Sequence, residues 1–214
     1  MFDNSIYAKL NDIADWMIRV VMLNLMMILF SLPVITIYPA FSAGYNMFSD
    51  YLEKKNTHLF RDYFRYFKES LGQKIMFSVI IILSYVLAYL NIRYYHEYLK
   101  TGPNLFYTIG YYVSLALIAM WTATVFYSIV VYKVKPKLAL MDVLKISFYM
   151  AGKFFWVTML LVIIALSPAL LILFLSPFTS LVFIIAGVAL PMLLAAVVTR
   201  PSVNHLRELS HQND

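Results

Sequence analysis

Long apolar blocks separated by short polar connectors dominate the hydrophobic pattern of this 214-residue chain. Five of them approach or exceed the roughly 20 residues that an α-helix needs to cross the core of a bilayer. They cover residues 17–38, 75–92, 105–132, 154–175 and 178–199. The pattern predicts an all-α, polytopic membrane helical bundle with five transmembrane helices, formed by residues 1–214 as a single integral membrane domain.

The first block contains polar residues and prolines that an apolar span does not need. Proline frees a backbone carbonyl inside a helix, and polar side chains at membrane depth usually face other helices. The set comprises Asn24, Ser31, Pro33, Thr36 and Pro39. These residues are candidates either for a polar path or ligand site, or for helix packing around a centre formed by this span.

Two amphipathic segments, residues 39–54 and 58–71, follow the first span. In the second segment, apolar residues recur at helical spacing and basic residues occupy the other faces, a pattern typical of an interfacial helix. Its candidate contact residues are Phe60, Arg61, Phe64, Arg65, Phe67 and Lys68. We expect two cytoplasmic helices whose basic residues contact anionic lipids of the inner leaflet or a protein partner. An ordinary helix packed on the bundle is the alternative.

Composition and charge agree with a membrane protein, because 62% of residues are apolar and only 13% are charged. The absence of cysteine excludes disulfides and thiolate metal sites. A formal net charge of +6 could suggest nucleic acid, but basic residues also gather in cytoplasmic loops for topological reasons. We therefore expect no nucleic-acid partner.

The distribution of Lys and Arg predicts the orientation. Basic residues are concentrated in the connectors after the first and third spans, which include Lys54, Lys55, Lys133, Lys135 and Lys137. By the positive-inside rule, these connectors and the C-terminus are cytoplasmic, and the N-terminus lies outside. The expected location is a cell membrane that the chain crosses several times.

Residues that carry catalysis are missing from the predicted spans. No Asp, Glu, Lys or His lies inside them, and the four histidines lack the spacing of a metal site. We expect no enzyme, no cofactor and no metal. Tyrosines and a tryptophan in and near the third span could stack on a sugar, although packing explains them as well. They are Tyr107, Tyr111, Tyr112, Trp121 and Tyr127.

The second long connector resembles the first in outline. Met141, Leu144 and Phe148 form an apolar stripe in it. Two small residues and a lysine, at 151–153, then lead into the next span. Either the chain contains an internal repeat, or both connectors are amphipathic simply because both lie at the membrane interface. Small residues at 40–44 would permit a homodimer.

A specific motif resembles a known family. It consists of an early asparagine, S-L-P-V-I-T-I-x-P-A-x-x-A and D-Y-F-R-Y-F-K, carried here by Asn24, residues 31–43 and residues 62–68. This pattern is similar to the YesL-like family of multi-pass membrane proteins of Gram-positive bacteria, whose function is undefined. The resemblance implies a location in the bacterial cell membrane and a gene clustered with those of carbohydrate ABC transporters, two-component regulators and polysaccharide-degrading enzymes. It supplies no site residues.

Two functions follow as expectations. The first is a non-enzymatic accessory or sensory factor linked to carbohydrate uptake, with an ABC sugar transporter or a histidine kinase as partner. The second is a small transporter or permease subunit for a saccharide or another small solute, in which Asn24, Thr36 and the later prolines shape the path.

Overall fold

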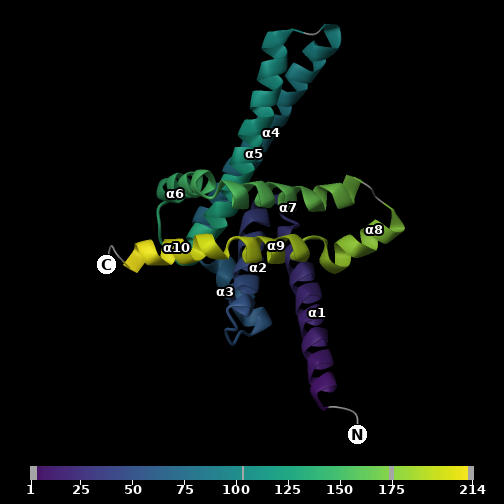
Figure 1. Cartoon of the computed structure of the whole chain (residues 1–214), viewed down its shortest axis with the longest axis vertical. Helices are drawn as coiled ribbons and strands as arrows, with labels where there is room; N and C mark the ends of the chain where they lie inside the picture. The colour runs from purple at the N-terminus through teal and green to yellow at the C-terminus, as the bar shows by residue number, and fades with distance from the viewer. Residues whose placement is uncertain (1–3, 103, 174–175, 212–214) are drawn as a thin grey trace. The chain divides into compact units, whose positions relative to one another are not determined.

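The computed structural model describes residues 4–102, 104–173 and 176–211, and every regular element within these ranges is a helix (Figure 1). This confirms the all-α prediction. The elements are α1 (Asn4–Ser31), η1 (Val34–Thr36), α2 (Ile37–Leu52), α3 (Leu59–Lys68), α4 (Leu71–Thr101), α5 (Leu105–Val134), α6 (Leu140–Lys153), α7 (Phe155–Leu173), α8 (Pro177–Val182), η2 (Phe183–Gly187), α9 (Ala189–Val198) and α10 (Arg200–His211).

The chain forms two compact units. Unit 1 contains Met1–Glu69 and Ile164–Val197, and unit 2 contains Ser70–Ile163 and Val198–Asp214. Three helical segments are long and apolar enough to cross a membrane, namely Leu10–Ser31, Leu71–Lys100 and Leu105–Val134. Up to five segments qualify among the described residues if each of two bent helix pairs counts as one span. These lengths are consistent with a membrane protein.

In unit 1, the first predicted span ends earlier than expected. Residues 17–38 do not form one helix, because α1 stops at Ser31 and α2 begins at Ile37. Pro33, which is extended at φ −71° and ψ 112°, explains the break. Proline lacks the N–H of a helical hydrogen bond, and it disfavours the helical conformation in the residue before it.

After this break the chain turns back, and α2 runs antiparallel along α1. Trp16, in the first half of α1, lies edge-on to Tyr51 near the end of α2, with ring centroids 6.0 Å apart. The Arg19 guanidinium lies 4.9 Å from the same Tyr51 ring. Close approach midway depends on Gly44, where an added Cβ would lie 2.1 Å from the Met27 sulfur. The hairpin therefore brings Trp16 and Arg19, in the first half of α1, beside the end of α2.

The two predicted amphipathic helices are present as α2 and α3, with slightly shifted bounds. Residues 38–51 of α2 are buried apart from Phe41, so this helix is the centre of unit 1 and not a surface helix. At about 1.5 Å per residue, its 16 residues span about 24 Å, less than the hydrocarbon core of a bilayer. It is a short, internal arm of the hairpin.

The last predicted span, residues 178–199, is broken in the structure. Thr179–Gly187 and Ala189–Val198 meet at an angle of 49°, and η2 at the break is a π-helix. Pro191 explains part of this geometry, because a proline cannot donate to the carbonyl four residues earlier, that of Gly187. The predicted span is therefore present as two helical pieces that meet at this bend.

Within the predicted fourth span, residues 154–175, α7 covers Phe155–Leu173, and residues 174–175 lie outside the described residues. Pro168 sits inside this helix and frees the carbonyl of Ile164. The Ser167 hydroxyl donates a hydrogen bond of 2.7 Å to that carbonyl. A polar side chain thus replaces the backbone donor that the proline lacks.

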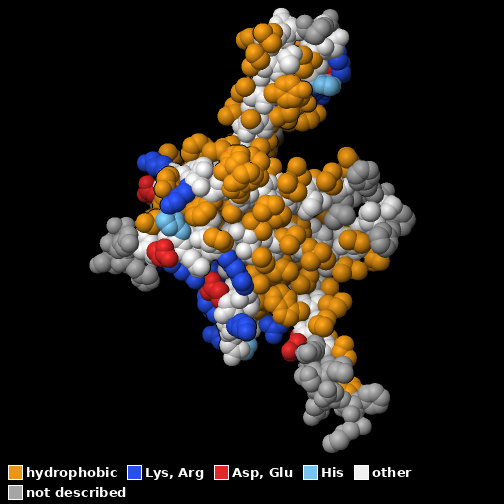
Figure 2. All heavy atoms as spheres, viewed as in Figure 1, with side chains coloured by type: hydrophobic (Ala, Val, Ile, Leu, Met, Phe, Trp, Pro, Cys, Tyr) orange, Lys and Arg blue, Asp and Glu red, His pale blue; other side chains and the backbone are white. Residues whose placement is uncertain are grey.

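Unit 2 is built on a long antiparallel hairpin of α4 and α5, which lie side by side in Figure 1. Both helices extend beyond the predicted spans 75–92 and 105–132. Ser114 donates to Asn91 at 2.7 Å across the pair, and Tyr85 lies 2.8 Å from Thr122. Hydrophobic side chains cover much of the outer surface of this hairpin (Figure 2), as expected for helices that face lipid.

The α6 helix, also in unit 2, packs on α5 with a different face from the predicted stripe. Val143, Ser147 and Met150 are buried, whereas Met141 is 62% exposed and Phe148 is 58% exposed. The predicted stripe is apolar but faces outward. A bend of 106° separates α6 from α7, and Thr158 bridges it by donating to the Ala151 carbonyl at 2.7 Å.

Candidate functional site

Asn24 is the most highly connected polar side chain of the first span. It is fully buried in α1, and its amide meets the break between η2 and α9. Nδ2 donates to the carbonyl oxygens of Phe183 (3.1 Å) and Ile184 (2.7 Å). Oδ1 accepts from the backbone N–H groups of Val188 (2.9 Å) and Ala189 (2.8 Å). Backbone carbonyl and N–H groups thus occupy all four hydrogen-bonding positions of the amide.

This arrangement identifies Asn24 as a clamp on the broken helix. The widened turn and the bend take backbone groups at 183–189 out of the regular helical ladder, and unpaired groups of this kind are costly in an apolar environment. The amide pairs two carbonyls on one side of the break with two N–H groups on the other. Asn24 is therefore committed to helix packing, with no hydrogen-bonding position left for a solute.

The other polar residues of the first span serve the break between α1 and α2. Ser31 donates to the Ile28 carbonyl at 2.9 Å. The Thr36 hydroxyl lies 2.7 Å from the carbonyl oxygens of both Phe30 and Pro33. Pro39 is buried in the first turn of α2, where its missing N–H has no helical partner to lose. The structure does not bring these residues together with Asn24 into one path.

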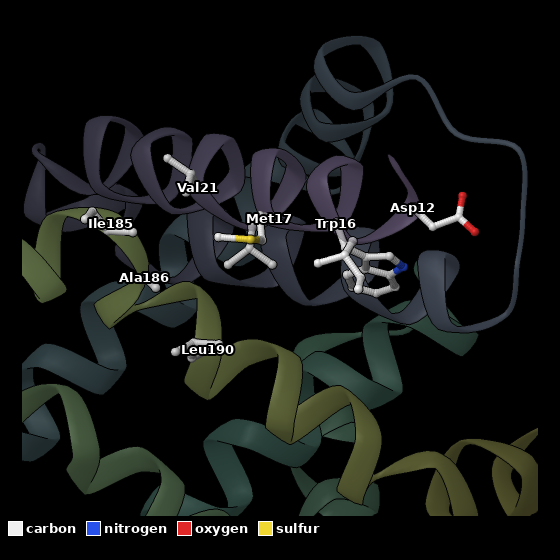
Figure 3. Close-up of a pocket in the computed structure, with 9 residues that line it drawn as sticks. Asp12, Trp16, Met17, Val21, Ile185, Ala186 and Leu190 are labelled. Carbon is white, nitrogen blue, oxygen red and sulfur yellow. The ribbon is translucent and has the colours of Figure 1, made fainter. Parts of the chain in front are cut away.

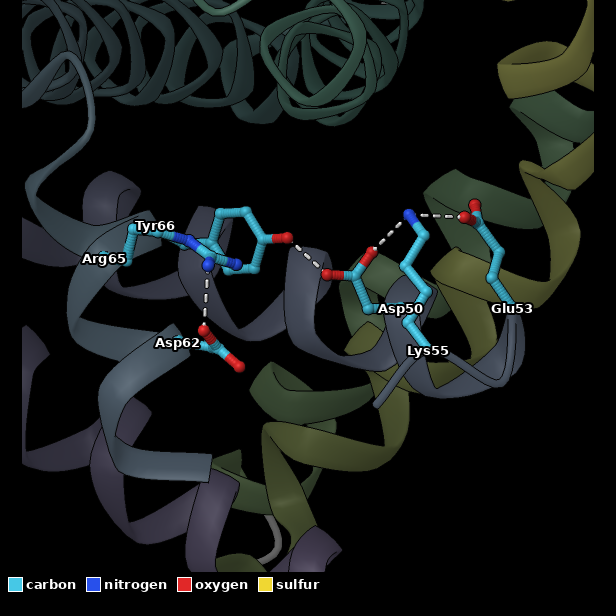
Figure 4. A network of polar contacts seen from close by, with 6 residues as sticks. All are labelled: Asp50, Glu53, Lys55, Asp62, Arg65 and Tyr66. Atoms are coloured by element: carbon cyan, nitrogen blue, oxygen red, sulfur yellow. Dashed lines mark hydrogen bonds and ion pairs between the residues drawn. The ribbon is translucent and has the colours of Figure 1, made fainter. Parts of the chain in front are cut away.

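A second polar centre joins α2, the connector and α3, and the sequence reading missed it (Figure 4). Asp50 is buried near the end of α2. It accepts a hydrogen bond from the Tyr66 hydroxyl, and its other oxygen pairs with Lys55 at 3.1 Å. Lys55 also pairs with Glu53 at 2.7 Å. A buried carboxylate is tolerated when it is paired and hydrogen-bonded in this way.

Asp62 extends this polar centre within α3. Its Oδ2 accepts from the His58 N–H at 2.7 Å, which caps the helix, and its Oδ1 pairs with Arg65 at 2.9 Å. The Arg65 guanidinium lies 4.8 Å from the centre of the Tyr66 ring. Two buried carboxylates, one on each helix, are thus linked through the neighbouring side chains of Arg65 and Tyr66.

Aromatic packing fixes the other side of α3. Tyr63 is fully buried and donates to the Ala40 carbonyl of α2 at 3.2 Å. Phe30 of α1 contacts the rings of Tyr63, Phe64 and Phe67, with centroids 5.9, 5.1 and 5.3 Å away. Burial raises the pKa of Tyr63, and burial together with Asp50 raises that of Tyr66 to about 12. Both phenols therefore remain protonated donors at physiological pH.

The remaining face of α3 is exposed. Phe60 is 56% exposed and Phe64 is 38% exposed, and the side chain of Arg65 is 60% exposed. Arg61 and Lys68 are also exposed, whereas Phe67 is half-buried against Phe30. A rigidly held helix thus presents two phenylalanines and three basic side chains. We call Phe60, Arg61, Phe64, Arg65 and Lys68 the α3 face.

The tyrosines considered for sugar stacking do not form one site. Tyr107 stacks on Tyr98 with a centroid distance of 4.8 Å, and Tyr127 is fully buried. Along the axis of α5, Tyr107 and Tyr127 are separated by about 30 Å at about 1.5 Å per residue. Separately, no group of three or more His, Cys, Asp or Glu residues suited to a metal ion occurs in the described part of the chain.

The geometry defines a helical protein with three to five potential membrane spans, a clamped broken helix and a rigid aromatic-basic helix. A family described as "Protein of unknown function, DUF624" matches residues 20–92. The matched region includes Asn24, the second part of α1, and the whole of α2 and α3. The searches of curated proteins and of solved structures returned no match.

Proposed function

We propose that this protein is a non-enzymatic membrane accessory factor that uses the α3 face to dock a protein partner. The observation that carries this proposal is the combination of rigidity and exposure in α3. Buried Tyr63 and Asp62 fix the helix on one side, while Phe60 is exposed on the other and Phe64, although its ring contacts Phe30, is 38% exposed. Exposed aromatic and arginine side chains on a rigid support are typical of interaction sites.

The nature of the partner rests on the YesL-like resemblance. On that basis we propose an accessory or sensory role in carbohydrate uptake, with an ABC sugar transporter or a histidine kinase as partner. The basic residues of the α3 face also suit anionic inner-leaflet lipid, at about 1 kcal/mol per basic side chain near the surface. Lipid contact alone is therefore the simpler alternative use of this face.

The α1–α2 hairpin affects which side of the membrane the start of the chain is expected to occupy. The Lys and Arg count places the connector that carries Lys54 and Lys55 in the cytoplasm and the N-terminus outside. Contacts of Trp16 and Arg19 with Tyr51, however, bring the first half of α1 to the same end of the hairpin as that connector. We therefore propose that the start of α1, the connector and the α3 face all lie on the cytoplasmic side.

Site-specific photocrosslinking in native membranes tests the docking proposal. With a photoreactive residue at Phe60 or Phe64, we expect one discrete protein adduct that mass spectrometry identifies. The matched control is Phe106, which is 70% exposed near the start of α5 and outside the α3 face. The same adduct from Phe106, or lipid adducts alone from Phe60 and Phe64, would contradict the docking proposal.

A small transporter or permease subunit is the second candidate. The observation that favours it is the broken helix at 183–189, because discontinuous helices shape substrate sites in many transporters. Against it, the backbone groups that bond Asn24 at the break are paired and are not free to bind a solute. Solute uptake by proteoliposomes that contain the protein alone would favour this candidate over the accessory role.

A further inference from the structure

Two adjoining pockets of different character lie along α1 in unit 1. The first, about 410 Å³, is lined mainly by apolar residues of α1, η2 and α9. The second, about 280 Å³, is lined by charged and aromatic residues of α1, α2 and the following connector. Asp12 and Trp16 line both pockets, so the two spaces adjoin at this pair. The apolar and the charged space therefore lie beside one another along the same stretch of α1.

The apolar pocket follows the axis of α1. In Figure 3, Asp12 and Trp16 lie at one end of it, and Val21 and Ile185 lie toward the other. At about 1.5 Å per residue, the distance along α1 from Asp12 to Val21 is about 14 Å. Its residues beyond Asp12 and Trp16 are Ile13, Met17, Val20, Val21, Ile185, Ala186 and Leu190. A long, narrow apolar surface of this kind suits a hydrocarbon chain.

The charged pocket offers both signs of charge. Arg19 and Lys54 supply positive charge, Lys55 lines the pocket while paired with Asp50 and Glu53, and Asp12 and Asp15 supply carboxylates. A purely anionic ligand would meet the two carboxylates, and a purely cationic one would meet the three basic groups. A ligand with one group of each sign fits better.

We propose that the two pockets together bind one phospholipid whose headgroup carries both a phosphate and a primary ammonium group. The acyl chain lies along the apolar pocket, and the headgroup occupies the charged pocket. The phosphate faces Arg19 and Lys54, and the ammonium donates hydrogen bonds to Asp12 and Asp15. Trp16 lies where the two pockets meet, the usual position of tryptophan at a membrane interface. This site is independent of the docking proposed for the α3 face.

Native mass spectrometry of the purified full-length protein tests the site. The protein is exchanged into mixed micelles with equal amounts of phosphatidylethanolamine, phosphatidylcholine and phosphatidylglycerol, and then delipidated stepwise. We expect one phosphatidylethanolamine to be retained last, because its ammonium carries the N–H donors that phosphatidylcholine lacks. Replacing both carboxylates, Asp12→Asn with Asp15→Asn, removes two charge contacts of about 1 kcal/mol each and should lower its retention about thirtyfold.

Two further variants complete the test. Ala186→Phe fills the apolar pocket and should abolish retention, while Asp142→Asn on exposed α6 should leave it unchanged. Asp12 and Asp15 are exposed, so their variants remain informative if Ala186→Phe does not fold. Equal retention of the three lipids, or retention that the Asp12 and Asp15 variants do not alter, would overturn the proposal. A second copy of the chain displaced by Ala186→Phe would also overturn it.

Discussion

Replacing Asn24 with leucine should destabilise the protein by about 2–5 kcal/mol, since side-chain hydrogen bonds between membrane helices contribute about 0.6–1.7 kcal/mol each. The substitution conserves approximate size but removes all four hydrogen bonds to the break between η2 and α9. The amides of Val188 and Ala189 would lose their acceptor. We therefore expect a lower midpoint of unfolding in detergent and faster hydrogen exchange at these two amides.

Asn91→Leu is the matched control for this experiment. Asn91 is exposed on α4, and its amide oxygen accepts from Ser114 alone among the hydrogen bonds described. We expect it to cost about 1 kcal/mol or less. If Asn24→Leu behaves like Asn91→Leu and leaves exchange at Val188 and Ala189 unchanged, Asn24 does not clamp the broken helix.

Replacing Asp50 with alanine should have the second large effect, about 2–4 kcal/mol of destabilisation, because it removes a buried carboxylate that is both hydrogen-bonded and paired with a charge. Tyr66 loses the acceptor of its hydroxyl, and Lys55 loses one of its two carboxylates. Since Tyr66 belongs to α3, this variant should also loosen the helix that carries the α3 face. Reversible unfolding in detergent measures the first effect, and crosslinking yield from Phe60 measures the second.

Asp142→Ala on α6 is the control for Asp50. Asp142 is exposed, and its partner Lys145 lies 3.9 Å away, so the loss should be about 1 kcal/mol or less. Equal losses of stability from the two variants would contradict the proposal that buried Asp50 holds α2 and α3 together. A large loss of stability with unchanged crosslinking from Phe60 would separate the fold of α3 from its proposed docking.

The sequence predicts the helices of this protein better than their contacts. Apolar block length is a local property, so the hairpin of α4 and α5 follows directly from the pattern. The break at Pro33 and the Ser167 bond beside Pro168 also follow from local backbone chemistry. The predicted first span nevertheless extends to residue 38, beyond the end of α1 at Ser31, because the apolar residues continue past Pro33.

The outward stripe of α6 shows why faces are harder to predict than helices. Periodicity marks Met141 and Phe148 as apolar, but in a lipid environment an apolar face need not be the packed face. The structure packs Val143, Ser147 and Met150 on α5, a face with a serine at its centre. Small and weakly polar residues allow helices to approach closely, so hydrophobicity alone selects the wrong side.

The candidate sites depend on pairs that are distant in the sequence. Asn24 stands out as a polar residue in an apolar span, yet its partners lie about 160 residues further along. Asp50 and Tyr66 carry no local signal of their pairing, and Asp50 resembles any charged residue near a helix end. Only the antiparallel return of α2 and the placement of α3 against it bring them together.

The central claim is that α1 and α2 form one hairpin that returns the chain to the face from which it started. The chain has no native cysteine, so single cysteines can be placed at Asn11, Asn56 and Gly102 and probed with a membrane-impermeant maleimide. Asn11 and Asn56 are exposed, and an added Cβ at Gly102 meets nothing within 4 Å. In intact cells we expect Gly102→Cys alone to react, and in inverted vesicles we expect both Asn11→Cys and Asn56→Cys to react. Labelling of Asn11→Cys from outside, with Asn56→Cys protected, would contradict the hairpin and restore the simple crossing that the charge pattern predicts.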